Sequence, residues 1–66
     1  MMIKQEIGKA IAARRDTLGI TQARLAKLSG ISAHTLSNLE TGEGNVTLAT
    51  LLKVAAIVGF KVRVGV

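Results

Sequence analysis

The sequence has no cysteine, no proline, no tryptophan and no tyrosine, and it has one histidine and one phenylalanine. Without cysteine the chain can form neither a disulfide framework nor a thiolate metal site. One histidine cannot build a zinc or iron site alone, so we expect no metal and no cofactor. The longest apolar run, residues 54–60, is far too short for a membrane span. Because Lys4 is followed by polar residues, no signal peptide is visible, and together these absences predict a soluble cytoplasmic protein.

A chain of 66 residues is expected to form one small domain, residues 1–66. Such a chain buries only about 60% of its unfolded surface, so a monomer is marginally stable and oligomerisation is a common remedy. The chain carries nine Lys or Arg against four Asp or Glu, a net charge of +5. Five of these cations lie within residues 9–27. This favours an anionic partner, either nucleic acid or an acidic membrane surface, over a basic surface that is merely solvated.

Apolar residues recur at the three/four spacing of amphipathic helices in four segments. We predict a first helix over residues 3–18, ended by Gly19. Thr21, Ser32 and Thr47 are predicted N-caps of three further helices, which end near residues 28, 41 and 58. The positions that follow this spacing are Ile3, Ile7, Ala10, Ile11, Arg14 and Leu18 in the first helix, Ala23, Leu25, Ala26 and Leu28 in the second, and Leu36 and Leu39 in the third. In the fourth helix we expect Leu48, Leu51, Leu52, Ala55 and either Ile57 or Val58 to face the core.

The C-terminal residues 60–66 have a different period. Phe60, Val62, Val64 and Val66 alternate with polar or small residues, which is the spacing of a β-strand. A single strand has no partner in its own chain, so it predicts pairing with a second copy.

The segment from Thr21 to Gly42 has the features of a helix-turn-helix, two short helices joined by a tight turn that contains glycine. Steeply crossing helices need a small contact residue, which Ala26 supplies, and the turn needs the positive φ that Gly30 adopts at little cost. The residues spaced to fill the wedge between the two helices are Leu25, Ile31, Leu36 and Leu39. An ordinary helical hairpin in a small bundle is the alternative.

The stretches "TQARLAKLSGIS", "LSNLETGEG" and "TLATLLKVAAIVG" resemble the lambdoid-phage repressor and Cro family, the XRE-type helix-turn-helix, over residues 5–59. With the terminal "FKVRVGV", the chain is most similar to the HipB-like antitoxins, whose last strand pairs across a dimer axis. The resemblance implies an all-α, four- to five-helix DNA-binding domain with its helix-turn-helix at residues 21–40 and a dimerisation strand at 60–66.

In that family the third helix enters the major groove of DNA, which is about 12 Å wide. The resemblance therefore implies base contacts from Ala33, His34 and Ser37. It implies phosphate contacts from Gln22, Ser32, Asn38, Arg14 and Lys27, with the Gln22 amide also against the recognition helix. It further implies a structural ion pair between Arg15 and Glu40, and a dimer strand whose apolar residues are Phe60, Val62, Val64 and Val66.

These features predict a nucleoid-associated repressor that binds a palindromic operator as a homodimer and has no membrane partner. The antitoxin interpretation adds a HipA-like toxin as a further partner. A freestanding phage-like repressor is the alternative within the same class, and a protein-interaction module that uses the fold without DNA is the alternative outside it. An enzyme is disfavoured, because the sequence offers no nucleophile with a supporting base, no paired carboxylates and no complete phosphate-binding loop.

Overall fold

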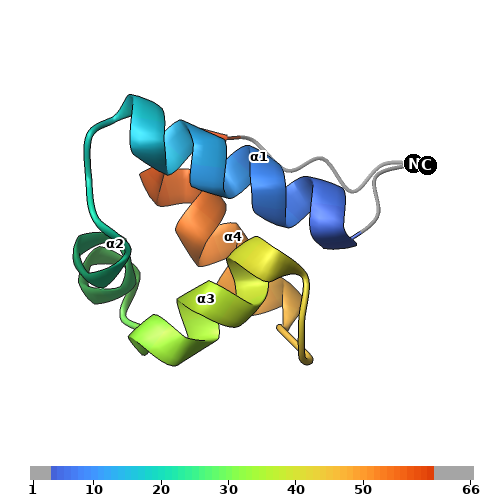
Figure 1. Ribbon diagram of the computed structural model, residues 1–66. Coiled ribbons are helices and arrows are strands. Elements are labelled where there is room, and N and C mark those ends of the chain that lie inside the picture. The colour runs from blue at the N-terminus through green and yellow to red at the C-terminus, as the bar shows by residue number, and fades with distance from the viewer. Residues whose placement is uncertain (1–3, 61–66) are drawn as a thin grey trace.

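Four helices make up residues 4–60, the part of the chain that the computed structural model describes (Figure 1). Their bounds are Lys4–Thr17 (α1), Gln22–Ser29 (α2), Ala33–Thr41 (α3) and Leu48–Ile57 (α4). Each lies within one or two residues of its predicted span, and no strand occurs within residues 4–60. The predicted terminal strand lies outside the described residues, apart from Phe60.

Hydroxyl side chains begin three of the helices, as predicted. Thr21, Ser32 and Thr47 each have extended backbone angles and accept a hydrogen bond from the backbone N–H three residues further on. Such a bond satisfies one of the donors that the start of a helix leaves unpaired. At the other end of α2, Gly30 has a φ of 69° and closes the helix in the left-handed conformation.

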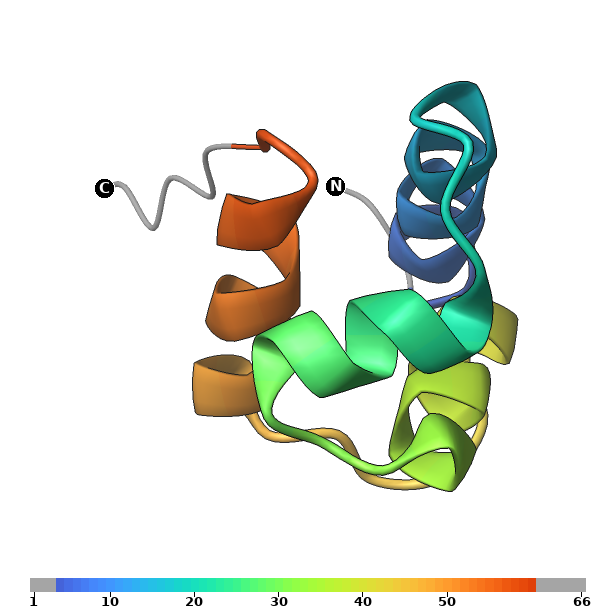
Figure 2. The ribbon, with the colours of Figure 1, turned by 90° about the vertical axis from the view of Figure 1, so that its left-hand side faces the viewer.

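The helices pack in three contacting pairs around one core. α1 lies across α3, while α2 packs against both α3 and α4, which Figure 2 shows from the side of α2. The core consists of Ile11, Leu25, Ala26, Leu36, Leu39, Val54 and Val58. Ile31 packs against this cluster from the turn between α2 and α3. The predicted small contact at Ala26 and the predicted wedge are therefore confirmed.

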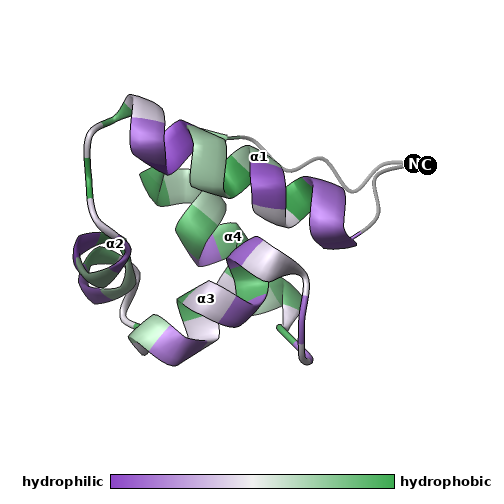
Figure 3. Ribbon diagram, in the orientation of Figure 1, coloured by the Kyte–Doolittle hydropathy of each residue, from purple (hydrophilic) through white to green (hydrophobic). Residues whose placement is uncertain are grey.

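Several apolar residues predicted by periodicity are exposed instead. Leu48, Leu52 and Ile57 are 54%, 41% and 43% exposed, and the buried stripe of α4 is Val54, Ala55 and Val58. The expectation that Leu48 and Leu52 face inward was wrong, whereas of the two alternatives Ile57 and Val58 it is Val58 that is buried. Ten residues with Lys53 as the only charge leave α4 apolar on nearly every side (Figure 3), so periodicity alone cannot select its inner face.

Periodic positions near the ends of the first two predicted helices, and one near the start of α2, are exposed as well. Leu18 and Leu28 are 45% and 46% exposed, and Ala23 is also exposed. Leu18 follows the last residue of α1, where the chain already turns through Gly19 at a φ of 71°. This turn sets the distance of the Leu18 side chain from the core. A helical wheel extended to residue 18 does not describe the turn and therefore misplaces this side chain.

One buried polar group near the end of α2 has no hydrogen-bond partner within residues 4–60. Ser29 is 6% exposed, and its Oγ forms no hydrogen bond within the described residues. Burying a hydroxyl without a partner costs about 1–3 kcal/mol.

Replacing Ser29 with alanine should therefore stabilise the protein. We expect a gain of about 1 kcal/mol, or roughly 4–8 °C in melting temperature, measured by circular dichroism. Ser32→Ala is the matched control, because Ser32 accepts a hydrogen bond from the Thr35 N–H at 3.0 Å and its loss should cost about 1 kcal/mol. A decrease for Ser29→Ala would mean that its hydroxyl is satisfied in solution.

Candidate nucleic-acid interface

The outer face of α3 carries no lysine, arginine, aspartate or glutamate. Ala33 and His34 are exposed and Ser37 is half-buried, whereas Leu36, Leu39 and Glu40 face inward. The 100° step of the helix separates these two sets. All three residues predicted to contact bases thus lie away from the core on one helix.

The start of α3 is held by hydroxyl groups. Ser32 Oγ accepts from the Thr35 N–H at 3.0 Å and donates to Thr35 Oγ1 at 2.8 Å. The first backbone N–H groups of a helix have no intrahelical acceptor and favour an anion in front of them. Ser32 therefore has a capping role, which is compatible with a contact to the DNA backbone.

Asn38 lies beside the loop that follows α3. Its Nδ2 is 3.4 Å from His34 Nε2, one helical turn earlier, and its backbone carbonyl accepts from the Glu43 N–H at 2.9 Å. A Cβ on Gly44 would approach Asn38 Nδ2 to 3.2 Å, so the loop backbone lies close to this amide. Lys4 holds the same loop from α1, because its Nζ donates to the Gly44 carbonyl at 2.8 Å.

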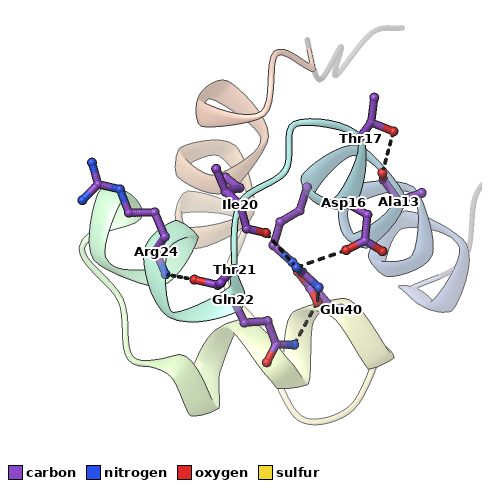
Figure 4. Close-up of polar contacts among 9 residues, drawn as sticks. Ala13, Asp16, Thr17, Ile20, Thr21, Gln22, Arg24 and Glu40 are labelled. Carbon is purple, nitrogen blue, oxygen red and sulfur yellow. Dashed lines mark hydrogen bonds and ion pairs between the residues drawn. The ribbon is translucent and has the colours of Figure 1, made fainter.

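A polar network joins three helices behind this face (Figure 4). Arg15 on α1 donates from Nε to Glu40 Oε2 at 2.8 Å and from Nη2 to Glu40 Oε1 at 3.2 Å. Gln22, the first residue of α2, donates from Nε2 to Glu40 Oε1 at 2.9 Å. The Glu40 side chain is only 5% exposed. The structure therefore brings the pair expected to be structural and the expected phosphate-binding glutamine into one cluster.

The charges in this network compensate each other. The hydrogen bond from the Arg15 guanidinium to Glu40 raises the pKa of Arg15 above its usual value, and burial opposes this shift. Arg15 also donates from Nη1 to the Ile20 carbonyl at 3.0 Å. The one carboxylate of α3 is thereby neutralised behind the outer face of the helix.

The two predicted cationic phosphate contacts occupy different places. Lys27 is exposed in the last turn of α2. Arg14 donates from Nε to the Val58 carbonyl at 3.0 Å, so it links the end of α1 to the end of α4. No pattern in the sequence indicated this link, because the contact joins residues 44 positions apart and bears no local signature.

Comparison with known proteins identifies the family. The model of the helix-turn-helix family HTH_3 matches residues 11–63, most of the chain. The chain therefore belongs to this helix-turn-helix family.

Two relatives support the assignment. An uncharacterised HTH-type transcriptional regulator of Haemophilus influenzae is 39% identical over 51 residues, which is 77% of this chain and 52% of the relative. The chain thus spans about half the length of this curated relative. The crystal structure of the restriction-modification controller protein C.AhdI from Aeromonas hydrophila is similar with a TM-score of 0.76 and 31% identity, over 83% of each chain. No helix within residues 4–60 is long and apolar enough to cross a membrane.

Proposed function

We propose that this protein is a sequence-specific repressor that places α3 in the major groove of duplex DNA. The observation that carries the proposal is the uncharged outer face of α3, with Ala33, His34 and Ser37, in a chain of the helix-turn-helix family. A major groove about 12 Å wide admits one helix. His34 and Ser37 would donate to or accept from base edges, and Ala33 would offer apolar contact to a thymine methyl group.

The residues around that face supply the phosphate contacts in this proposal. Ser32 lies at the start of α3, Gln22 at the start of α2, and Asn38 beside the loop after α3, so all three can approach a backbone that borders the groove. Lys27 adds positive charge from α2. Arg14 bonds the Val58 carbonyl through its Nε, so its Nη groups would make the phosphate contact in this proposal.

Direct readout by these residues is sparse. Neither arginine nor lysine lies on α3, so the bidentate contact to guanine that many regulators use has no donor there. Sequence-dependent DNA shape and deformability would therefore provide a larger share of the specificity.

The first test is binding to duplex DNA as a function of salt. If a dimer meets about six to eight phosphates, the slope of log K against log salt should be near −5 to −7 for B-DNA. Fluorescence anisotropy with a labelled random duplex and with the promoter of the protein's own gene would measure this slope. A slope near zero would remove phosphate contact from the mechanism.

Alanine variants serve as controls that separate the two kinds of contact. His34→Ala and Ser37→Ala should weaken binding to the duplex from the protein's own promoter more than binding to random duplex, since they remove base contacts. Asn38→Ala should weaken both about equally. If His34→Ala and Ser37→Ala also affect both duplexes equally, these two residues do not read bases.

We further propose that the protein acts as a homodimer on a palindromic operator. The supporting observation is the outer face of α4, where Leu48 and Leu52 are about half exposed beside the alanines of the same helix. An apolar helix face of this kind is expected to be covered. The alternating residues of the predicted terminal strand would extend the same interface, and a two-fold axis would set the α3 helices about 34 Å apart, one turn of DNA.

Deleting residues 60–66 should convert the dimer to a monomer and lower its melting temperature. Burial of the predicted strand's apolar residues would contribute several kcal/mol, at about 25 cal/mol per Å2. Sedimentation equilibrium measures the mass of the truncated chain. Leu52→Ser is a second variant, which tests the face of α4, and Lys9→Ala on α1 is the control. A truncated chain that remains dimeric would show that the strand is not part of the interface, and a dimeric Leu52→Ser would exclude α4.

The antitoxin role is a finer proposal within the same function. It rests on the alternation at residues 60–66 that resembles the HipB-like antitoxins, which lies outside the described residues apart from Phe60. A HipA-like toxin encoded beside this gene, co-purifying with the protein, would support it. Repression of its own promoter without any toxin would favour the freestanding repressor.

A further inference from the structure

We infer that Glu40 is a positioning residue for DNA binding: from the buried side of α3 it holds the Gln22 amide so that one N–H remains directed at a phosphate. The inference rests on the proposed function, because it assumes that Gln22 meets the DNA backbone. It concerns a residue that makes no DNA contact itself, since the Glu40 side chain is only 5% exposed.

The orientation of the amide follows from the chemistry of its partner. A carboxylate only accepts hydrogen bonds, so the end of the Gln22 amide that faces Glu40 Oε1 at 2.9 Å must be the nitrogen. One Nε2 proton is used in this bond. Within residues 4–60 the second Nε2 proton has no acceptor, and it is the donor left for a phosphate oxygen.

The position of the amide also suits an anion. Gln22 is the first residue of α2, where unpaired backbone N–H groups and the helix dipole favour negative charge. Thr21 Oγ1 occupies the Arg24 N–H at 3.1 Å, which leaves the N–H groups of Gln22 and Ala23 without an intrahelical acceptor. A phosphate at this point would be met by backbone and side-chain donors together.

Arg15 makes this arrangement compatible with a negative ligand. An unpaired carboxylate behind Gln22 would repel a phosphate, but Arg15 binds both oxygens of Glu40 at 2.8 and 3.2 Å and cancels its charge. Arg15 is in turn fixed to the Ile20 carbonyl, just before α2 begins. The ion pair therefore orients Gln22 without adding net charge to the site.

Fixing the amide in advance should strengthen binding, because a free glutamine side chain loses rotamer freedom when it binds. Gln22→Met keeps the length of the side chain and removes its donors. We expect it to weaken binding to a labelled 20-base-pair random duplex about tenfold, or about 1.4 kcal/mol. In a Glu40→Gln background, residue 40 carries an amide that no longer fixes which end of the Gln22 amide faces it. There Gln22→Met should weaken binding by about twofold or less.

The binding assays are run at a temperature where circular dichroism shows each variant to be folded. Val58→Ala is the control for stability alone. It removes buried packing from the core at a position far along the chain from Gln22, and it should bind duplex normally. An equal effect of Gln22→Met in both backgrounds would overturn the role of Glu40. No effect in either background would overturn the role of Gln22 as a contact.

A measurement without DNA separates this inference from the proposed function. The chain has two glutamines, and Gln5 is exposed. In the wild-type protein the Gln22 side-chain NH2 should exchange its protons with solvent more slowly than that of Gln5, by NMR. Equal exchange would overturn the inference even if Glu40→Gln does not fold. If the wild-type protein fails to bind duplex while the Gln22 amide is protected, both the proposed function and the positioning role in DNA binding fail. The hydrogen bond that holds Gln22 against Glu40 would still stand.

Discussion

Replacing Gly8 with alanine should strongly destabilise the protein, although alanine normally stabilises a helix by about 1 kcal/mol over glycine. Gly8 is buried within α1, at the crossing with the end of α3. A Cβ at this position would lie against the Leu39 carbonyl oxygen and within 2.6 Å of the Glu40 carbonyl oxygen. These are backbone atoms, which cannot rotate away as a side chain could.

The two helices would have to separate to admit the methyl group. Overpacking of this kind costs about 3 kcal/mol at the upper end of its usual range, and a separation would also stretch the bonds between Arg15 and Glu40. In a domain of this size about 3 kcal/mol corresponds to roughly 12–24 °C in melting temperature.

Urea denaturation followed by circular dichroism would measure this loss. Lys9→Ala is the matched control, because Lys9 is exposed on the same helix and its replacement should change stability by less than about 0.5 kcal/mol. An unchanged or increased stability of Gly8→Ala would mean that α1 and α3 do not approach this closely in solution.

Gly8 also shows where prediction from the sequence ends. A lone glycine inside a helical pattern only weakens the helix prediction, and the sequence does not say that another backbone lies against it. The caps at Thr21, Ser32 and Thr47 were predictable, because each depends on residues only three positions away. The contact from Arg14 to Val58 depends on how α1 and α4 meet, and no local pattern encodes it.

The candidate site divides in the same way. Its recognition helix could be placed from the offset between Ala26 and Gly30, because the geometry of the turn fixes where the next helix begins. The pairing of Arg15 with Glu40 came from the family resemblance alone. The hydrogen bond from Gln22 to Glu40 joins the ion pair to the expected phosphate-binding glutamine. Its partner and its length could be found only from the three-dimensional structure.

Removing the guanidinium of Arg15 should be the second large loss. In Arg15→Met the Glu40 carboxylate would remain buried with only the Gln22 amide as a partner, and the Ile20 carbonyl would lose its donor. Breaking one partner of a buried ion pair costs about 3–5 kcal/mol, most of it from the charge left behind.

The size of this loss should depend on burial, and Arg15 offers an internal comparison. Its Nη1 lies 3.3 Å from Asp16 Oδ1, but the Asp16 side chain is 75% exposed, whereas the Glu40 side chain is 5% exposed. Asp16→Asn should therefore cost less than about 1 kcal/mol. The double variant Arg15→Met/Glu40→Met should regain most of the stability lost in Arg15→Met, because it leaves no charge unpaired.

Urea denaturation of the single and double variants completes this cycle. A loss for Arg15→Met as small as that for Asp16→Asn would show that Glu40 is hydrated in solution. A double variant as unstable as Arg15→Met alone would place the cost in lost packing and in the Ile20 bond. Full recovery would instead mean that the pair adds little net stability, which leaves the orientation of Gln22 at the start of α2 as its main effect.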